Sequence, residues 1–160
     1  TRAEILENFF SYLHDNVKDT GVILSIDLFG MTTTVATDMG IGQILEKTFP
    51  YFDYVSPMVY PSHYPPTWNG FAKPAEHPYD VVKLAMSEGK RREEVYKLSL
   101  GMATTTASKL RPWLQDFNLG STYDDTIVRY QIQATYDVGL DSWMLWNAGN
   151  KNTKEALLSN

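Results

Sequence analysis

VILSIDLF, residues Val22–Phe29, decides the fold because it is short, rich in branched side chains and almost continuously apolar. These are the properties of a strand that is buried on both faces, as strands of parallel sheets are. Similar runs follow at Tyr54–Val59, Leu110–Phe117 and Ser142–Trp146, and segments with helical periodicity separate them. This alternation predicts an α/β fold, with parallel strands and helices in one domain over residues 1–160.

Four β/α units amount to half of an eight-stranded TIM (β/α)8 barrel. A free half-barrel would expose two unpaired strand edges and uncovered apolar side chains. We therefore expect an N-terminal half-barrel in the parent protein, or self-association, to cover that surface. We favour the N-terminal half, so that this chain is the C-terminal half of the barrel. A complete small α/β domain with an open sheet and an interaction role is the alternative.

The spacing of apolar residues predicts helices over residues 2–18, 41–49, 78–89 and 122–138, with another beginning at residue 152. Ser121 or Thr122 is expected to cap the fourth of these helices. We expect the charged run Lys90–Glu94 to be solvated, and residues 94–102 fit either a strand or a helix. Residues 61–78 hold five of the eight prolines and predict a long functional loop.

Two prolines lie inside predicted strands. Pro57 and Pro112 lack the N–H group that a strand residue donates to its neighbour. We therefore expect a bulge at each proline, or a strand that begins late.

The composition excludes several classes of function. The chain of 160 residues carries a net charge of −5 and has no basic stripe, so it is not expected to bind nucleic acid. It has no apolar run long enough to span a membrane and no cysteine for disulfides, thiolate metal sites or thiol nucleophiles. His63 and His77 are too far apart for a typical zinc site, and the glycines of residues 40–42 do not form a dinucleotide fingerprint. We expect no metal and no cofactor.

Polar and aromatic side chains gather where the predicted strands end. Two are carboxylates, Asp27 and Asp116, and a pair of carboxylates across the scissile bond is what glycosidic hydrolysis needs. Alternatively, Asp27 caps a loop or pairs with a cation such as Arg111. The groups expected to orient a sugar by hydrogen bonds or ring stacking are Tyr60, His63, Tyr64, Arg111, Trp113, Gln115, Trp146 and Asn147.

The third strand limits this arrangement. Side chains alternate between the two faces of a strand, so Arg111, Trp113 and Gln115 share one face. Asp116 then shares the other face with Leu114. Gln115 and Asp116 are not both expected to point into the barrel unless the strand bends.

Four segments, VILSIDLFG, DYVSPMVYPSHY, LRPWLQDF and QIQATYDVGLDSWMLWNA, occur in this order over nearly the whole chain. In them the chain resembles a bacterial family of putative glycoside hydrolase domains of unknown specificity. The resemblance implies a sugar-cleaving (β/α)8 barrel of which this chain contributes strands five to eight. It implies an oligo- or polysaccharide substrate, hydrolysis of O-glycosidic bonds, and strand-end carboxylates at Asp27 and Asp116.

A non-catalytic module that binds carbohydrate or cell-wall polysaccharide is the alternative function. The sequence itself leaves the compartment open, and the resemblance is compatible with an extracellular or cell-surface location in a bacterium.

Overall fold

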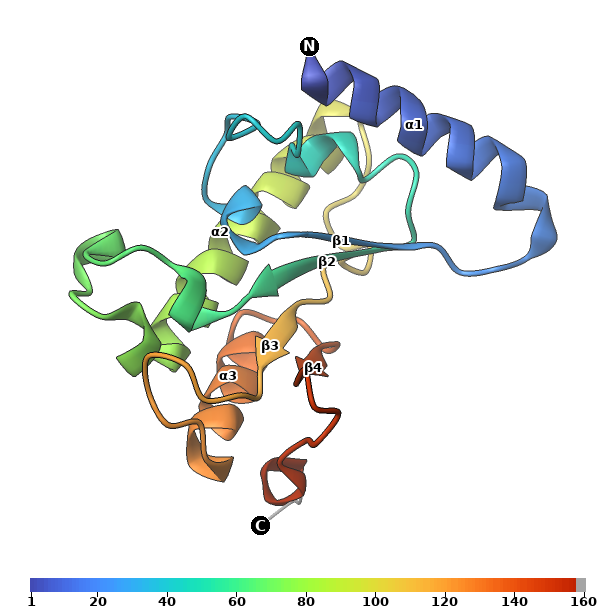
Figure 1. Cartoon of the computed structure of the whole chain (residues 1–160). Helices are drawn as coiled ribbons and strands as arrows, with labels where there is room; N and C mark the ends of the chain where they lie inside the picture. The colour runs from blue at the N-terminus through green and yellow to red at the C-terminus, as the bar shows by residue number, and fades with distance from the viewer. Residues whose placement is uncertain (158–160) are drawn as a thin grey trace.

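The computed structural model of the protein describes residues 1–157. Four parallel strands form one sheet in the order β1-β2-β3-β4, so neighbours along the chain are neighbours in the sheet (Figure 1). The helices and strands are α1 Arg2–Val17, β1 Ser25–Phe29, β2 Tyr54–Val59, α2 Pro78–Ser99, β3 Trp113–Gln115, α3 Asp125–Asp137 and β4 Met144–Trp146. The predicted α/β fold of parallel (β/α) units is confirmed, and it is the arrangement of half a (β/α)8 barrel.

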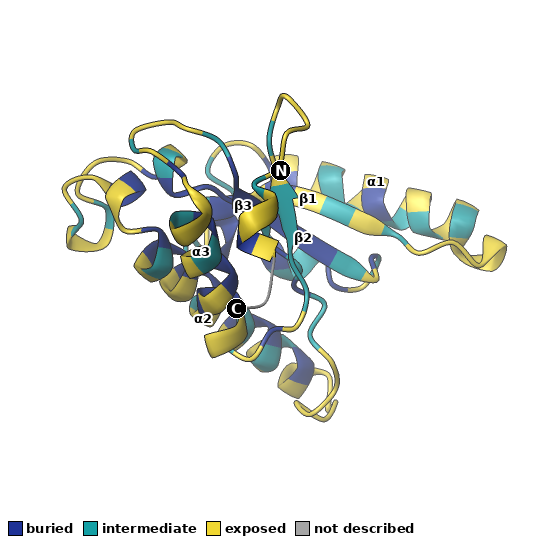
Figure 2. Cartoon of the chain, turned by 90° about the horizontal axis from the view of Figure 1, so that it is seen from below, coloured by how far each residue is buried: buried dark blue, intermediate teal, exposed yellow. Residues whose placement is uncertain are grey.

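The two faces of the sheet differ in what covers them. Helices α2 and α3 lie side by side against one face, where the burial is greatest (Figures 1 and 2). The side chains that form this core include Leu28, Val55, Val59 and Leu114 from the strands and Val82, Met86, Val128 and Ile132 from the helices. On the other face, the strands carry exposed or half-buried side chains such as Asp27, Phe29 and Trp146. We call this second face the open face.

Helix α1 begins where the sequence predicts it, because Thr1 and Glu4 form a reciprocal capping box. The helix rests on the body through Phe10, whose ring meets that of Phe52 edge to face at 5.3 Å between centroids. Its outer surface is apolar as well, since Ile5 and Phe9 are 71% and 53% exposed. One apolar side of α1 is therefore uncovered in this chain.

The two strand prolines lie opposite each other. The pairing between β2 and β3 has the same register before and after a short stretch without paired residues. Pro57 lies opposite Pro112 in that stretch. The backbone N–H and C=O groups of Val55 form hydrogen bonds with the segment that leads into β3. Pro57 is two residues further along β2, so the position of its missing N–H also faces that segment. No bulge forms at Pro57, and β2 does not begin late. β3 does begin late, at Trp113, as predicted for a strand with a proline at its start.

Helix α2 corrects the prediction for the charged run Lys90–Glu94. The helix continues through these residues to Ser99, and Arg92 and Glu93 are 7% and 2% exposed. Glu93 accepts a hydrogen bond from the backbone N–H of Lys109 and pairs with Lys97 at 3.0 Å. Arg92 and Glu93 are buried rather than solvated because partners on other segments satisfy their charges. Arg91, in the same run, remains exposed.

Three smaller predictions are also corrected. The helix expected at residues 41–49 is only a 3-10 turn at Leu45–Lys47, because Gly40 and Gly42 adopt positive φ angles of 73° and 84° that interrupt a helix. Asp124, rather than Ser121 or Thr122, caps α3 by accepting from the Ile127 N–H. The segment after residue 152 forms a 3-10 turn at Lys154–Leu157, and the rest of the expected helix lies outside the described residues.

Candidate functional site

Asp27 lies on the open face, on the edge strand β1. It belongs to β1, opposite Ser56 of β2, and its side chain is exposed. The indole Nε1 of Trp113 donates a hydrogen bond to Asp27 Oδ1 at 2.8 Å across the face. Among residues 1–157, no ion pair joins Asp27 to Arg111. The carboxylate is thus fixed by a neutral donor and remains accessible.

Trp113 and Trp146 form an aromatic surface beside this carboxylate. Their ring centroids are 6.0 Å apart and their planes are nearly perpendicular, at 84°. Trp146 is 43% exposed at the edge strand β4. A carboxylate hydrogen-bonded to one indole of this pair offers both hydrogen bonding and an apolar ring face, which is the pair of contacts that a sugar ring uses.

A second aromatic group stands at the C-terminal end of β2. The rings of Tyr60, His63 and Phe117 meet edge to face, with centroids 5.4 to 6.0 Å apart. Burial raises the pKa of Tyr60, and the negative charge of Asp27 raises it further, so the phenol stays neutral and lies within the field of that carboxylate. The sequence predicts Tyr60 and His63 but misses Phe117, whose only signal is its place at the end of the predicted third strand, two residues after β3.

A cavity of about 220 Å³ opens next to this group. Its walls come from the ends of β1 and β2 and from the segments that follow them, and they are Phe29, Gly30, Met31, Met58, Tyr60, His63 and Tyr64. Tyr64 is 5% exposed, and its hydroxyl has no hydrogen-bond partner within residues 1–157. Phe29 and Met58, which the sequence analysis did not select, are paired in register and share the face of Asp27.

Gln115 is fully buried and holds the segment after β2 in place. Its Oε1 accepts from the Ser62 N–H at 3.1 Å, and its Nε2 donates to the carbonyl oxygen of Phe117 at 2.9 Å. The side chain of Gln131 in α3 in turn binds both backbone groups of Gln115. Gln115 therefore positions the aromatic group, and its predicted contact with a sugar stays a prediction.

Asp116 lies apart from Asp27. It follows Gln115, so strand alternation turns its side chain away from the open face, as the sequence indicates. It is 2% exposed, and its two oxygens accept hydrogen bonds from the N–H and the hydroxyl of Thr153 at 2.8 and 2.6 Å. Asn147 donates to the carbonyl oxygen of Asp116 at 2.5 Å. Asp116 and Asn147 together anchor the C-terminal segment.

Arg111 occupies the open face closer to the start of the sheet. Its guanidinium lies 5.3 Å from the ring centroid of Tyr54, a cation–π contact. Its Nε is buried and finds no hydrogen-bond partner in the described part of the chain. The structure thus brings together Asp27, Tyr60, His63, Trp113 and Trp146, and it leaves Arg111 at the margin of this group.

Two findings bear on other kinds of site. In the part of the chain that the structure describes, no cluster of His, Cys, Asp and Glu has the arrangement to hold a metal ion. None of the helices within residues 1–157 combines the length and the apolar character that a membrane crossing requires.

A family model described as "Putative glycosyl hydrolase domain" matches residues 1–152, which is nearly the whole chain. No curated protein and no solved structure matches it. The match covers all four strands and both aromatic groups of the open face. The chain therefore belongs to the putative glycosyl hydrolase domain family.

Proposed function

We propose that the open face binds carbohydrate and takes part in hydrolysis of an O-glycosidic bond, with Asp27 as the nucleophile or general base. The observation that carries the proposal is the 2.8 Å hydrogen bond from Trp113 to Asp27 on an exposed surface. This hydrogen bond uses one carboxylate oxygen and orients the other, while the indole of Trp146 packs against the far side of Trp113, on β4. Family membership supports a sugar substrate.

A second carboxylate is needed for the usual glycosidase mechanisms. The contacts of Asp116 with Thr153 favour a structural role for it, because a buried carboxylate with two donors is neither accessible nor near Asp27. We propose that the second acid projects from other β/α units that cover the open face. An N-terminal half-barrel in the parent protein would supply them, as would a second copy of the chain.

The uncovered surfaces support such a partner. The strands β1 and β4 are both edges of the sheet, and unpaired edges are usually protected in native proteins. The exposed side of α1 adds Ile5, Phe9 and Tyr12, which are 71%, 53% and 64% exposed and recur at helical spacing. Burial of these side chains against a neighbouring helix would continue the outer ring of a barrel.

A non-catalytic carbohydrate-binding module is the second candidate function. The observation that favours it is the presence of one carboxylate, Asp27, beside aromatic rings, with Asp116 buried elsewhere. Aromatic surfaces bind sugars without any need for a second acid. The two functions differ in one measurable property, the release of new reducing ends.

The test compares Asp27→Asn and Asp116→Asn in the full-length protein on a panel of oligo- and polysaccharides. We expect Asp27→Asn to lower kcat by about 10²- to 10⁴-fold, the usual contribution of such a group, while glycan binding persists. We expect Asp116→Asn to lower thermal stability and to leave kcat of the folded protein nearly unchanged. Wild-type binding without reducing-end release would favour the binding module. A large loss of kcat in Asp116→Asn at unchanged stability would restore the pair of carboxylates predicted from the sequence.

A further inference from the structure

The cavity at the ends of β1 and β2 adjoins the proposed catalytic carboxylate. Phe29 is two residues beyond Asp27 on the same face of β1, and the negative charge of Asp27 contributes to the raised pKa of Tyr60. A sugar bound at Asp27 would therefore present one of its substituents to this cavity. The cavity measures about 220 Å³, which is enough for a small substituent.

Its walls are mainly apolar. Phe29, Met31 and Met58 supply hydrocarbon and thioether surface, and the seven lining residues include neither lysine nor arginine. A phosphate or sulfate group would lose its hydration there without gaining a strong cationic partner. The polar side-chain groups of the walls belong to Tyr60, His63 and Tyr64.

One buried polar group stands in these walls. The hydroxyl of Tyr64 is buried and has no partner among the described residues. Burial raises the pKa of Tyr64, so its phenol is neutral and retains a proton to donate. An unpaired buried hydroxyl costs free energy, and an acceptor that enters the cavity would remove that cost.

Gly30 makes room for this hydroxyl. A Cβ atom at Gly30 would lie 3.1 Å from the Tyr64 hydroxyl oxygen and would overlap the carbonyl oxygen of Met58. The bare backbone at this position thus brings the end of β1 against β2 and lets the phenol reach the cavity wall. Only a residue without a side chain fits here.

We propose that this cavity receives an acetyl group carried by the sugar substrate, with its methyl group against Met31 and Met58 and its carbonyl oxygen accepting from Tyr64. An acetyl group combines a compact apolar end with a single strong acceptor, which matches the apolar walls and the unpaired hydroxyl donor of Tyr64. The inference rests on the proposed function and narrows it to acetylated glycans. An N-acetyl group and an O-acetyl group share this chemistry.

The test measures binding of matched sugar pairs to the full-length protein by ligand-observed NMR. The pairs are glucose, galactose and mannose with their 2-acetamido counterparts, and the same three sugars with one O-acetyl group. We expect the acetylated member of at least one pair to bind roughly 5- to 10-fold more tightly, the worth of one hydrogen bond with some apolar burial. The acetyl methyl protons should receive the strongest saturation transfer from the protein. A preference for the amide or for the ester identifies the source of the acetyl group.

Tyr64→Phe keeps the ring and removes the donor, so it should lower the acetyl preference about 3- to 10-fold. Tyr123→Phe is the matched control, because Tyr123 is equally buried but donates to the carbonyl oxygen of Ala75 at 3.1 Å, away from the cavity. It should leave the preference unchanged. Equal binding of both members in every pair, or an unchanged preference in Tyr64→Phe, overturns the inference alone. Binding of no sugar at all overturns the proposed function with it.

Discussion

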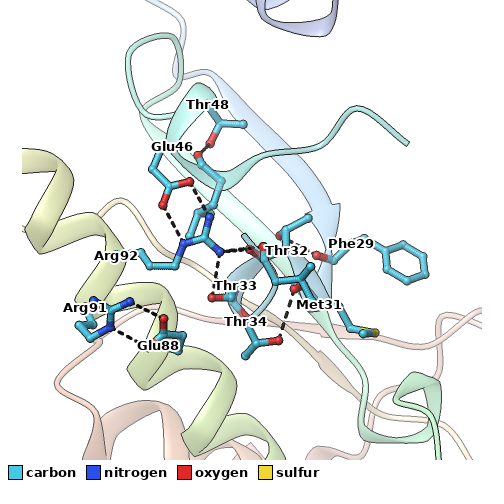
Figure 3. Close-up of polar contacts among 12 residues, drawn as sticks. Phe29, Met31, Thr32, Thr33, Thr34, Glu46, Thr48, Glu88, Arg91 and Arg92 are labelled. Atoms are coloured by element: carbon cyan, nitrogen blue, oxygen red, sulfur yellow. Dashed lines mark hydrogen bonds and ion pairs between the residues drawn. The ribbon is translucent and has the colours of Figure 1, made fainter. Parts of the chain in front are cut away.

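Replacement of Arg92 by methionine tests how the segment after β1 is held. Arg92 projects from α2, and its guanidinium binds both oxygens of Glu46 at 2.7 and 2.5 Å (Figure 3). It also donates to the carbonyl oxygens of Thr32, Thr33 and Val35 at 2.5, 3.2 and 3.0 Å. These carbonyls lie just beyond the residues that line the cavity. One side chain thus connects α2 to the end of β1.

The magnitude follows from what the substitution leaves unpaired. Removal of one partner of a buried ion pair costs about 3–5 kcal/mol. The side chain of Glu46 is 35% exposed, so water compensates part of this loss. We therefore expect Arg92→Met to lower the free energy of unfolding by roughly 2–4 kcal/mol. For a chain of this size, that corresponds to a decrease in Tm of roughly 4–16 °C.

The neighbouring residue provides the control. Arg91 also forms a two-bond pair, with Glu88 at 2.8 and 2.6 Å, but its side chain is 59% exposed (Figure 3). Arg91→Met should cost less than about 1 kcal/mol, as exposed pairs do. Urea unfolding followed by circular dichroism measures both variants, with Glu46→Met and the double variant completing a cycle for Arg92. Equal costs for the two arginines, or strict additivity of the Arg92 and Glu46 substitutions, would refute the reasoning.

Three further predictions concern the same structure. Burial alone would raise the pKa of Glu46, but the hydrogen bonds and charge of its arginine partner outweigh burial and lower the pKa below its ordinary value of 4.5. The pair therefore stabilises the fold above that pH, and this stabilisation should be lost as the pH falls through the lowered pKa. Acid titration of the wild type and of Arg92→Met measures the difference. Gly30→Ala should lower the free energy of unfolding by roughly 3 kcal/mol, because its Cβ overlaps a strand carbonyl; thermal unfolding measures it, and a cost under 1 kcal/mol would contradict the close approach. Asp116→Asn should lower the free energy of unfolding by about 2 kcal/mol, since the buried group that accepts from the N–H and the hydroxyl of Thr153 loses its charge and one of its two acceptor oxygens. Thr153→Val removes the hydroxyl donor and should reduce the cost of Asp116→Asn in a double-variant comparison.

The local pattern of the sequence was sufficient for the order of the strands and for the existence of α1, α2 and α3. The four apolar runs correspond to β1 to β4, and the spacing of apolar residues locates α1 and α3 within one to three residues. Alternation along the third strand also predicts that Gln115 and Asp116 face different ways. These features depend on neighbours in the sequence, which a single sequence displays directly.

What the sequence could not reveal depends on distant partners. Lys90–Glu94 has the composition of a solvated run, and only the tertiary structure supplies Glu46 for Arg92, 46 residues away. Asp116 has the position of a catalytic acid, and its partner Thr153 lies 37 residues further on. In both cases a charge became part of the core because donors and acceptors from another element converge on it. The sequence shows which residues are charged and where they lie along the chain, whereas the contacts in the folded structure determine the role of each charge.

The same reasoning separates the two candidate functions of the open face. Glycosidases place two carboxyl groups within about 5 to 10 Å of each other across the scissile bond. Asp27 satisfies one half of that requirement, because Trp113 orients it on an accessible surface. The second group would have to project toward Asp27 from the far side of the open face, where a closed barrel has its opposite strands. The proposed hydrolysis therefore requires the units that complete a barrel, whereas the proposed sugar binding by the aromatic rings and by the cavity that Tyr64 lines requires residues of this chain alone.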